Sequence, residues 1–149
     1  MEEKKVLEKM ERLCSKAEYC SSDIRRKVLK ALEGDEAAAS RILKTLCKEC
    51  FVDDARYAGA FVREKSALTG WGPLKIKMAL RAKGIDGPVV DEALGEAFSE
   101  AAEDKLERLL QAKCRSLQGD PSIKLKLLRY GLGRGYTYEQ VAPVVEGLL

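Results

Sequence analysis

The chain has 149 residues, enough for one domain or a short array of repeats, and a net charge of +3. Hydrophobic residues make up 46% of it, too many for a generally disordered chain, and no apolar run approaches the roughly 20 residues of a membrane-spanning helix. The charged start of the sequence lacks the apolar core of a secretory signal, so we expect a cytoplasmic protein.

Apolar residues recur at helical spacing along nearly the whole chain, which predicts an all-α fold. The first predicted helix covers residues 4–18. A serine, either Ser21 or Ser22, is expected to cap the second helix. Gly34 and Asp35 separate it from the third, and Asp53 is expected to cap the fourth. The inner face of this fourth helix is expected to hold Tyr57, Phe61 and Leu68.

Glycine followed by proline marks two further helix starts. Proline is favoured at the first helical position, so helices are predicted to begin after Gly72 and Gly87. Gly84 is expected to end the first of these two helices. A longer helix through Leu106 and Leu110 follows the second.

The last part of the chain predicts two more helices. Asp120 starts the first of them and Gly135 stops it. Thr137 and Gln140 can form a capping box for the final helix. Pro143 lies inside that helix and is expected to kink or shorten it.

The helix starts recur with a period near 50 residues. Those at Ser21, Gly72 and Asp120 are 51 and 48 residues apart. Such a period is typical of helical repeat arrays, whose units bury their apolar faces against neighbours. We therefore predict an elongated, curved array of three tandem three-helix repeats. Its predicted parts are an N-terminal helix (1–18), repeat 1 (19–68), repeat 2 (69–117) and a shorter repeat 3 (118–149).

Basic residues concentrate in the short helix that opens each predicted repeat. Arg26 and Lys30 are four residues apart, as are Lys77 and Arg81, so each pair shares a helix face. Like charges at this spacing repel one another, and their recurrence favours a partner that neutralises them over a merely solvated face. The predicted surface for a partner protein or DNA comprises Arg25, Arg26, Lys30, Lys75, Lys77, Arg81, Lys83, Lys124, Lys126, Arg129 and Arg134.

Two motifs stand at the centre of the chain: the acidic and aromatic segment 51–62, and Gly70-Trp71-Gly72 with the residues up to Ile85. As a pair they resemble the two signatures of the RecX regulatory proteins. Residues 17–27 resemble the opening repeat of that family. Arg134-Gly135-Tyr136 resembles an arginine-glycine-aromatic element of its third repeat. The resemblance covers roughly residues 10–146. Its signature residues, which we interpret as mainly structural, are Asp53, Asp54, Arg56, Tyr57, Phe61, Gly70, Trp71, Gly72, Gly84 and Gly135.

The resemblance implies tandem three-helix repeats and a regulatory function. RecX proteins bind the recombinase RecA in its filament on single-stranded DNA and usually inhibit it. The recombinase activity, the ATPase and the coprotease activity of the SOS response would then be affected. It further implies contact with single-stranded DNA, and double-stranded DNA is a further candidate; we expect a monomer without a membrane partner. The alternative is a helix-turn-helix protein that acts on duplex DNA.

An enzyme is a third hypothesis, and the residue inventory argues against it. The chain has no histidine, so it lacks the commonest general base and the commonest metal ligand. It also has no nucleophile motif and no phosphate-binding loop. Asp53 and Asp54 could be paired catalytic or metal-binding carboxylates, but adjacent residues on a helix point about 100° apart, so we favour a helix cap. We expect no catalytic residue and no cofactor.

Cysteine, tryptophan and one glycine leave alternatives open. Cys14, Cys20, Cys47 and Cys50 could together make a zinc site. Buried, reduced thiols are, however, the usual state of free cysteine. Trp71 could stack on a base or anchor a partner, but we favour a plug at the joint between repeats 1 and 2. Gly131 stands where we expect a larger apolar residue in repeat 3.

Overall fold

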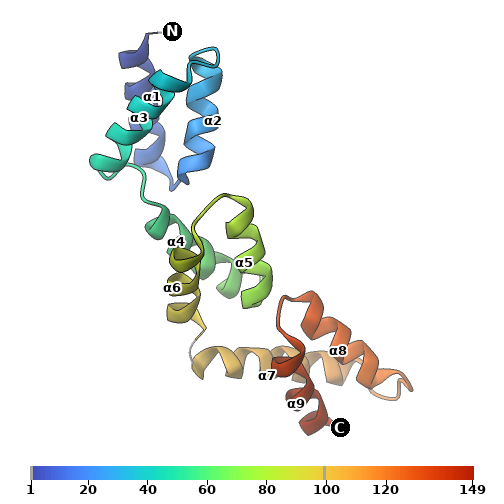
Figure 1. Cartoon of the computed structure of the whole chain (residues 1–149). Coiled ribbons are helices and arrows are strands. Elements are labelled where there is room, and N and C mark those ends of the chain that lie inside the picture. The colour runs from blue at the N-terminus through green and yellow to red at the C-terminus, as the bar shows by residue number, and fades with distance from the viewer. Residues whose placement is uncertain (1, 99) are drawn as a thin grey trace. The chain divides into compact units, whose positions relative to one another are not determined.

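All regular secondary structure in the described part of the chain is helical. The computed structural model describes residues 2–98 and 100–149, apart from the side chains of residues 100–103. Within these ranges there are nine helices and no strand, which confirms the predicted all-α fold (Figure 1). The helices are α1 (Glu3–Lys16), α2 (Ser21–Ala31), α3 (Glu36–Lys48), α4 (Asp54–Ala67), α5 (Pro73–Ala82), α6 (Gly87–Ala97), α7 (Glu100–Ser116), α8 (Ile123–Gly133) and α9 (Tyr138–Leu148).

The chain forms two compact units. The first unit comprises the chain up to Phe61 together with Leu80–Val90, and the second unit comprises Val62–Ala79 and Asp91–Leu149. The repeat boundaries proposed from the period of the sequence, and the elongated, curved form of the array, stay predictions.

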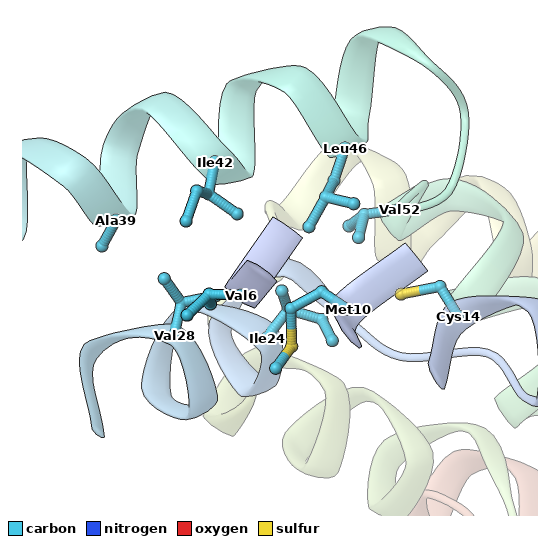
Figure 2. Close-up of a cluster of buried hydrophobic side chains, with 9 residues drawn as sticks. All are labelled: Val6, Met10, Cys14, Ile24, Val28, Ala39, Ile42, Leu46 and Val52. Atoms are coloured by element: carbon cyan, nitrogen blue, oxygen red, sulfur yellow. The ribbon is translucent and has the colours of Figure 1, made fainter. Parts of the chain in front are cut away.

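The core of the first unit joins α1, α2 and α3. Val6, Met10 and Cys14 recur every fourth residue of α1, so their side chains lie on one face of the helix. All three are buried, and each fully buried large apolar side chain stabilises the fold by about 1.5–3 kcal/mol. Figure 2 shows them against the side chains of the neighbouring segments, which are Ile24, Val28, Ala39, Ile42, Leu46 and Val52.

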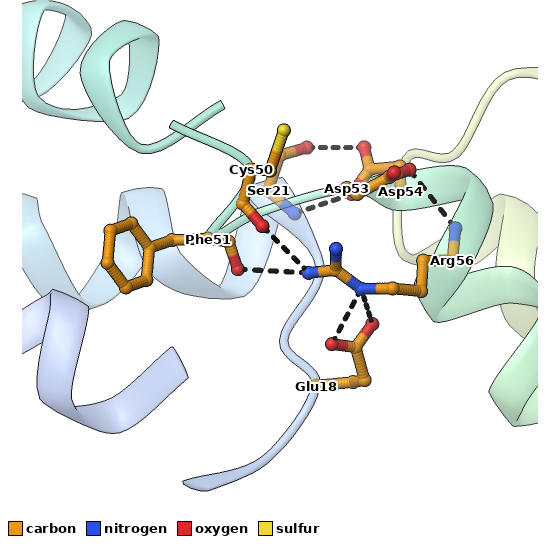
Figure 3. A network of polar contacts seen from close by, with 7 residues as sticks. All are labelled: Glu18, Ser21, Cys50, Phe51, Asp53, Asp54 and Arg56. Atoms are coloured by element: carbon orange, nitrogen blue, oxygen red, sulfur yellow. Dashed lines mark hydrogen bonds and ion pairs between the residues drawn. The ribbon is translucent and has the colours of Figure 1, made fainter. Parts of the chain in front are cut away.

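The start of α2 is capped by a carboxylate from α4 and not by a serine. Cys20 occupies the N-cap position and makes no side-chain capping bond. Asp54 accepts hydrogen bonds from the backbone N–H of Ser21 at 2.7 Å and from its hydroxyl at 2.6 Å (Figure 3). The hydroxyl of Ser22 instead donates to the carbonyl of Lys83 at 2.6 Å. The predicted serine cap is therefore wrong, because a charged acceptor satisfies the positive end of a helix better than a neutral hydroxyl.

The neighbouring signature residues clamp the turn before α4. Asp53 accepts the backbone N–H of Arg56 at 3.1 Å, which confirms it as the cap of α4. The guanidinium Nε of Arg56 donates to the carboxylate of Glu18 at 2.7 Å, and its Nη2 donates to the carbonyls of Cys50 and Phe51 (Figure 3). The hydrogen bond with Glu18, together with the charges of Glu18 and Asp53, raises the pKa of Arg56 above its ordinary value. Asp53, Asp54 and Arg56 thus have a structural role in the first unit.

The core of the second unit joins α7, α8 and α9. Its buried side chains are Leu106, Leu110, Cys114, Leu127, Tyr136, Val141 and Val145. Gly131 is buried on α8, and a Cβ there would lie 2.6 Å from one methyl carbon of Val141 and 2.7 Å from the other. The expectation of a larger residue at this position is therefore wrong, because the side chain of Val141 already fills the space. Absence of a side chain lets α8 and α9 approach closely.

A backbone contact joins the start of α5 to the end of α8 within the second unit. The N–H of Gly72 donates to the carbonyl of Arg134, and the N–H of Leu74 donates to the carbonyl of Gly135 at 2.8 Å. The unpaired donors at the beginning of one helix are thereby matched with unpaired acceptors at the end of another. A Cβ on Gly72 would lie 2.6 Å from the carbonyl carbon of Gly135, so only glycine allows this approach.

Other local predictions are partly confirmed. Asp35 caps α3 by accepting the N–H of Ala38, and the capping box of Thr137 and Gln140 is formed at α9. However, α9 continues past Pro143 to Leu148, so the proline does not shorten it.

Two expectations near the ends of helices are wrong. Leu68 follows the end of α4 and is 80% exposed, so it does not belong to the inner face of that helix. Asp120 precedes a turn and not the helix itself, because it accepts the N–H of Ser122 and α8 begins only at Ile123.

Candidate macromolecule-binding surface

The predicted basic residues divide into exposed and half-buried groups. The exposed ones are Arg26, Lys30, Lys75, Lys77, Arg81, Lys124, Lys126 and Arg129. Arg25, Lys83 and Arg134 are half-buried. The exposed bases come from α2, α5 and α8, which are short helices of 10 or 11 residues.

A hollow on the first unit brings Lys83 next to the bases of α2. Its volume is about 430 Å³, and we call it the α2 hollow. The ammonium of Lys83 lies 2.9 Å from one carboxylate oxygen of Asp23, and the guanidinium of Arg26 lies 3.6 Å from the other. The side chains that line the hollow are Tyr19, Asp23, Arg26, Lys27, Lys30 and Lys83.

Both members of the Asp23–Lys83 pair are held in their charged forms. Burial acts to raise the pKa of Asp23, but the hydrogen bonds from Lys83 and Cys20 and the nearby cations outweigh it, so the pKa lies below its ordinary value. The hydrogen bond with Asp23 also raises the pKa of Lys83 above its ordinary value. Since only one carboxylate faces four cations, the lining of the α2 hollow is positive.

Sequence reasoning missed three members of this hollow. Tyr19 and Asp23 were not among the predicted residues, and Lys27 was left out of the predicted surface. The ammonium of Lys27 lies 5.7 Å from the centre of the Tyr19 ring. The sequence does hold a signal for this contact. Tyr19 precedes α2 by less than one helical turn and Lys27 lies about two turns further along, a spacing that puts both on one side of the helix.

The exposed face of α5 in the second unit mixes apolar and basic side chains. Leu74 and Met78 are 46% and 67% exposed and lie one turn apart. Lys75 and Lys77 are interspersed with them, and α5 contains no acidic residue. Lys77 is paired with Asp91 of α6 at 3.1 Å. Large exposed apolar side chains beside cations are suited to contact with another protein.

The face of α8 has a similar composition. Lys124 and Arg129 are exposed, and Leu125 is 50% exposed beside Lys124. Lys126 forms an ion pair with Asp120. A shallow hollow of about 390 Å³ at the start of α8 is lined by Pro121, Ser122, Lys124, Leu125 and Leu128.

Other predicted bases make internal hydrogen bonds. Arg134 donates to the carbonyl of Thr69 at 2.8 Å and to the hydroxyl of Tyr130 at 3.2 Å, and so holds the turn before α5. Arg81 donates to the carbonyl of Ile85 at 2.8 Å, and Arg25 donates to the hydroxyl of Ser40 at 3.4 Å. A contact of these residues with a partner stays a prediction.

The remaining signature residues are half-buried aromatic side chains or glycines in turns. The indole of Trp71 is half-buried, and the ammonium groups of Lys65 and Lys75 lie 4.9 and 4.5 Å from its ring centre. The rings of Tyr57 and Phe61 lie 6.0 Å apart on α4. Gly70, Gly84 and Gly135 have positive φ, which glycine adopts without strain and which suits the turns around α5 and after α8.

The five cysteines differ in burial. Cys14, Cys20 and Cys114 are buried, as expected for free thiols, whereas Cys47 and Cys50 are exposed, so that expectation is wrong for these two. Burial raises the pKa of the Cys14 thiol. Among the residues that the structure describes, no group of three or more cysteine, aspartate or glutamate side chains could hold a metal ion. No helix in the same ranges is long and apolar enough to cross a membrane.

Fold and surface together define a small all-helical protein that displays basic side chains on α2, α5 and α8. A family model described as "RecX, second three-helix domain" matches residues 53–94, which extend from the cap of α4 into α6. The chain is 33% identical to "Regulatory protein RecX" of Clostridium acetobutylicum over 79% of this chain and 57% of that relative. It is also 33% identical to the RecX of Halalkalibacterium halodurans, over 81% of this chain and 45% of that relative. The chain thus spans about half the length of these relatives.

Solved structures agree with this assignment. A crystal structure of regulatory protein RecX matches with a TM-score of 0.84 and 25% identity, over 97% of this chain and 71% of the other. The crystal structure of RecX from Lactobacillus salivarius matches with a TM-score of 0.86 and 22% identity, over 98% and 96% of the two chains, and supports the fold. The chain belongs to the RecX family of regulatory proteins.

Proposed function

We propose that this protein binds the RecA filament on single-stranded DNA and inhibits its recombinase, ATPase and SOS coprotease activities. Membership of the RecX family supports a regulatory function. The observation that carries the proposal further is the side-chain composition of α2, α5 and α8, whose exposed bases suit a partner rich in phosphate or carboxylate. In this proposal the protein acts in the cytoplasm, as a monomer, by binding alone and without a catalytic step.

The two components of a nucleoprotein filament call for two kinds of contact. Phosphates require cations and release counterions when they bind, so the bases of α2 suit the DNA. Leu74 and Met78 on α5 contribute nothing to phosphate binding, but apolar side chains in a polar surround suit a protein surface. We assign α5 to the RecA contact, with Lys75, Lys77 and Arg81 meeting acidic groups of that protein.

The test adds the purified protein to RecA filaments on single-stranded DNA and follows ATP hydrolysis and filament length. The parent protein is expected to slow hydrolysis and shorten filaments. The double variant Lys77→Glu/Arg81→Glu should inhibit at least tenfold more weakly, since like-charge contacts across an interface cost several kcal/mol. The matched control, Lys4→Glu/Lys5→Glu, makes the same charge change at two exposed positions on α1.

The results separate the proposal from its alternatives. Equal inhibition by the parent and the α5 variant contradicts the α5 contact, and no effect of the parent on filaments contradicts the proposed function. A large preference for one duplex sequence over random DNA would favour the helix-turn-helix alternative. Hydrolysis of ATP or cleavage of DNA by the purified protein alone would show that the protein is an enzyme.

A further inference from the structure

We propose that the α2 hollow binds single-stranded nucleic acid, with the backbone phosphates on its cations and one base against Tyr19. This inference rests on the proposed function and deepens it, because it assigns the DNA contact to one site of the first unit. The residues that carry the phosphate contact are Arg26, Lys27, Lys30 and Lys83.

The cations of the α2 hollow converge from two segments far apart in the sequence. Lys83 follows α5 and is 60 residues away from Asp23, yet their side chains are hydrogen bonded at 2.9 Å. Asp23 is only 18% exposed, so its charge serves mainly to hold Lys83 in place. A ligand therefore meets an ammonium that is already positioned, which lowers the entropy cost of binding.

The α2 hollow is accessible to a long ligand, because three of its four cations are exposed. Arg26 has a side-chain exposure of 77%, and Lys27 and Lys30 are exposed as well. Arg26 and Lys30 lie one helical turn apart on the same face. A row of accessible cations suits a chain of phosphates that passes across the hollow. Because cations bind phosphate oxygens of any sequence, this contact supplies affinity without base specificity.

An aromatic ring, that of Tyr19, lines the hollow together with the cations. Tyr19 packs against the buried core of the first unit and also lines the hollow, so its ring is held in place. A fixed aromatic ring next to a positive groove is the arrangement used for single strands, whose unpaired bases can stack. The bases of a duplex are already stacked on one another. Tyr19 therefore favours single-stranded nucleic acid over duplex DNA and over an acidic protein.

The experiment measures binding of the full chain to labelled oligo-dT, to a hairpin duplex and to inorganic polyphosphate at several salt concentrations. The variant Lys27→Gln/Lys30→Gln removes two exposed cations, and Lys4→Gln/Lys5→Gln on α1 is the matched control. Tyr19→Leu removes the aromatic ring but keeps an apolar side chain for the core. Thermal unfolding of each variant checks that the fold is retained.

Specific results are expected. Lys27→Gln/Lys30→Gln should weaken oligo-dT binding at least tenfold and reduce the slope of log K against log salt by about 1.4, since each phosphate contact on a single strand contributes about 0.7. Tyr19→Leu should weaken oligo-dT binding roughly five- to tenfold and leave polyphosphate binding unchanged. The control should leave the slope unchanged.

Two outcomes would overturn the inference. One is an unchanged salt slope in Lys27→Gln/Lys30→Gln; the other is a Tyr19→Leu effect that is absent, or equal for oligo-dT, duplex and polyphosphate. Failure of the proposed function looks different, because the parent would then bind oligo-dT through the hollow without any effect on RecA filaments.

Discussion

Replacement of Gly131 by alanine tests the close packing of α8 against α9. In an open helical position this change is favourable by about 1 kcal/mol, because alanine has the higher helix propensity. At Gly131 the new carbon would lie 2.6 and 2.7 Å from the two methyl carbons of Val141. Val141 is completely buried, and a valine in a helix has one strongly preferred rotamer, so it cannot turn away.

Overpacking of this kind costs about 1–3 kcal/mol, and the near contact of both methyl groups places Gly131→Ala in the upper part of that range. After the propensity gain of about 1 kcal/mol is subtracted, the free energy of unfolding should fall by about 1–2 kcal/mol. The assay is urea unfolding of the full chain followed by circular dichroism.

Two further variants make the result specific. Gly95→Ala on α6 is the matched control: no atom lies within 4 Å of its new carbon, so it should stabilise by about 0.5–1 kcal/mol. In a Val141→Ala background the space is open, and Gly131→Ala should become stabilising, with a coupling of about 2–3 kcal/mol between the two sites. If Gly131→Ala stabilises the parent protein as Gly95→Ala does, or shows no coupling to Val141, the packing argument is refuted.

Three other predictions concern single contacts. Asp54→Ala leaves the N–H and hydroxyl of Ser21 without their acceptor and should lower the free energy of unfolding by about 1–2 kcal/mol; no loss in urea unfolding would contradict the cap. Gly72→Ala, by steric conflict with the end of α8, should lower it by at least about 2 kcal/mol, and a thermal melt like that of the parent would contradict this. The pKa of Asp23 lies below its ordinary value, so its contribution is fully present above about pH 4 and is lost as pH falls through the lower, folded-state pKa. The stability difference between the parent and Asp23→Asn should therefore shrink in urea titrations at acidic pH, and a constant difference down to pH 2 would contradict the pairing with Lys83.

Most of the local structure could be predicted because its causes act over three or four residues. Apolar spacing predicted the helices, and Asp53 and Thr137 were recognisable as caps because a cap bonds to the N–H groups that follow it directly. The RecX motifs in segments 51–62 and 70–85 are short-range patterns of the same kind. The matches to a RecX family model and to RecX relatives confirmed the family.

Only the tertiary structure decided which distant residues meet. The cap of α2 comes from Asp54, 33 residues from Ser21, and no local pattern favours it over the adjacent serines. Lys83 contacts Asp23 because the packing of the helices brings the two segments together. Lys83 thereby lines one hollow with the bases of α2. Position 131 was expected to hold a larger residue, but Val141 on the next helix leaves no space for a side chain there. Helix formation follows from the order of neighbouring residues, whereas these contacts depend on how finished helices pack, which short-range spacing does not encode.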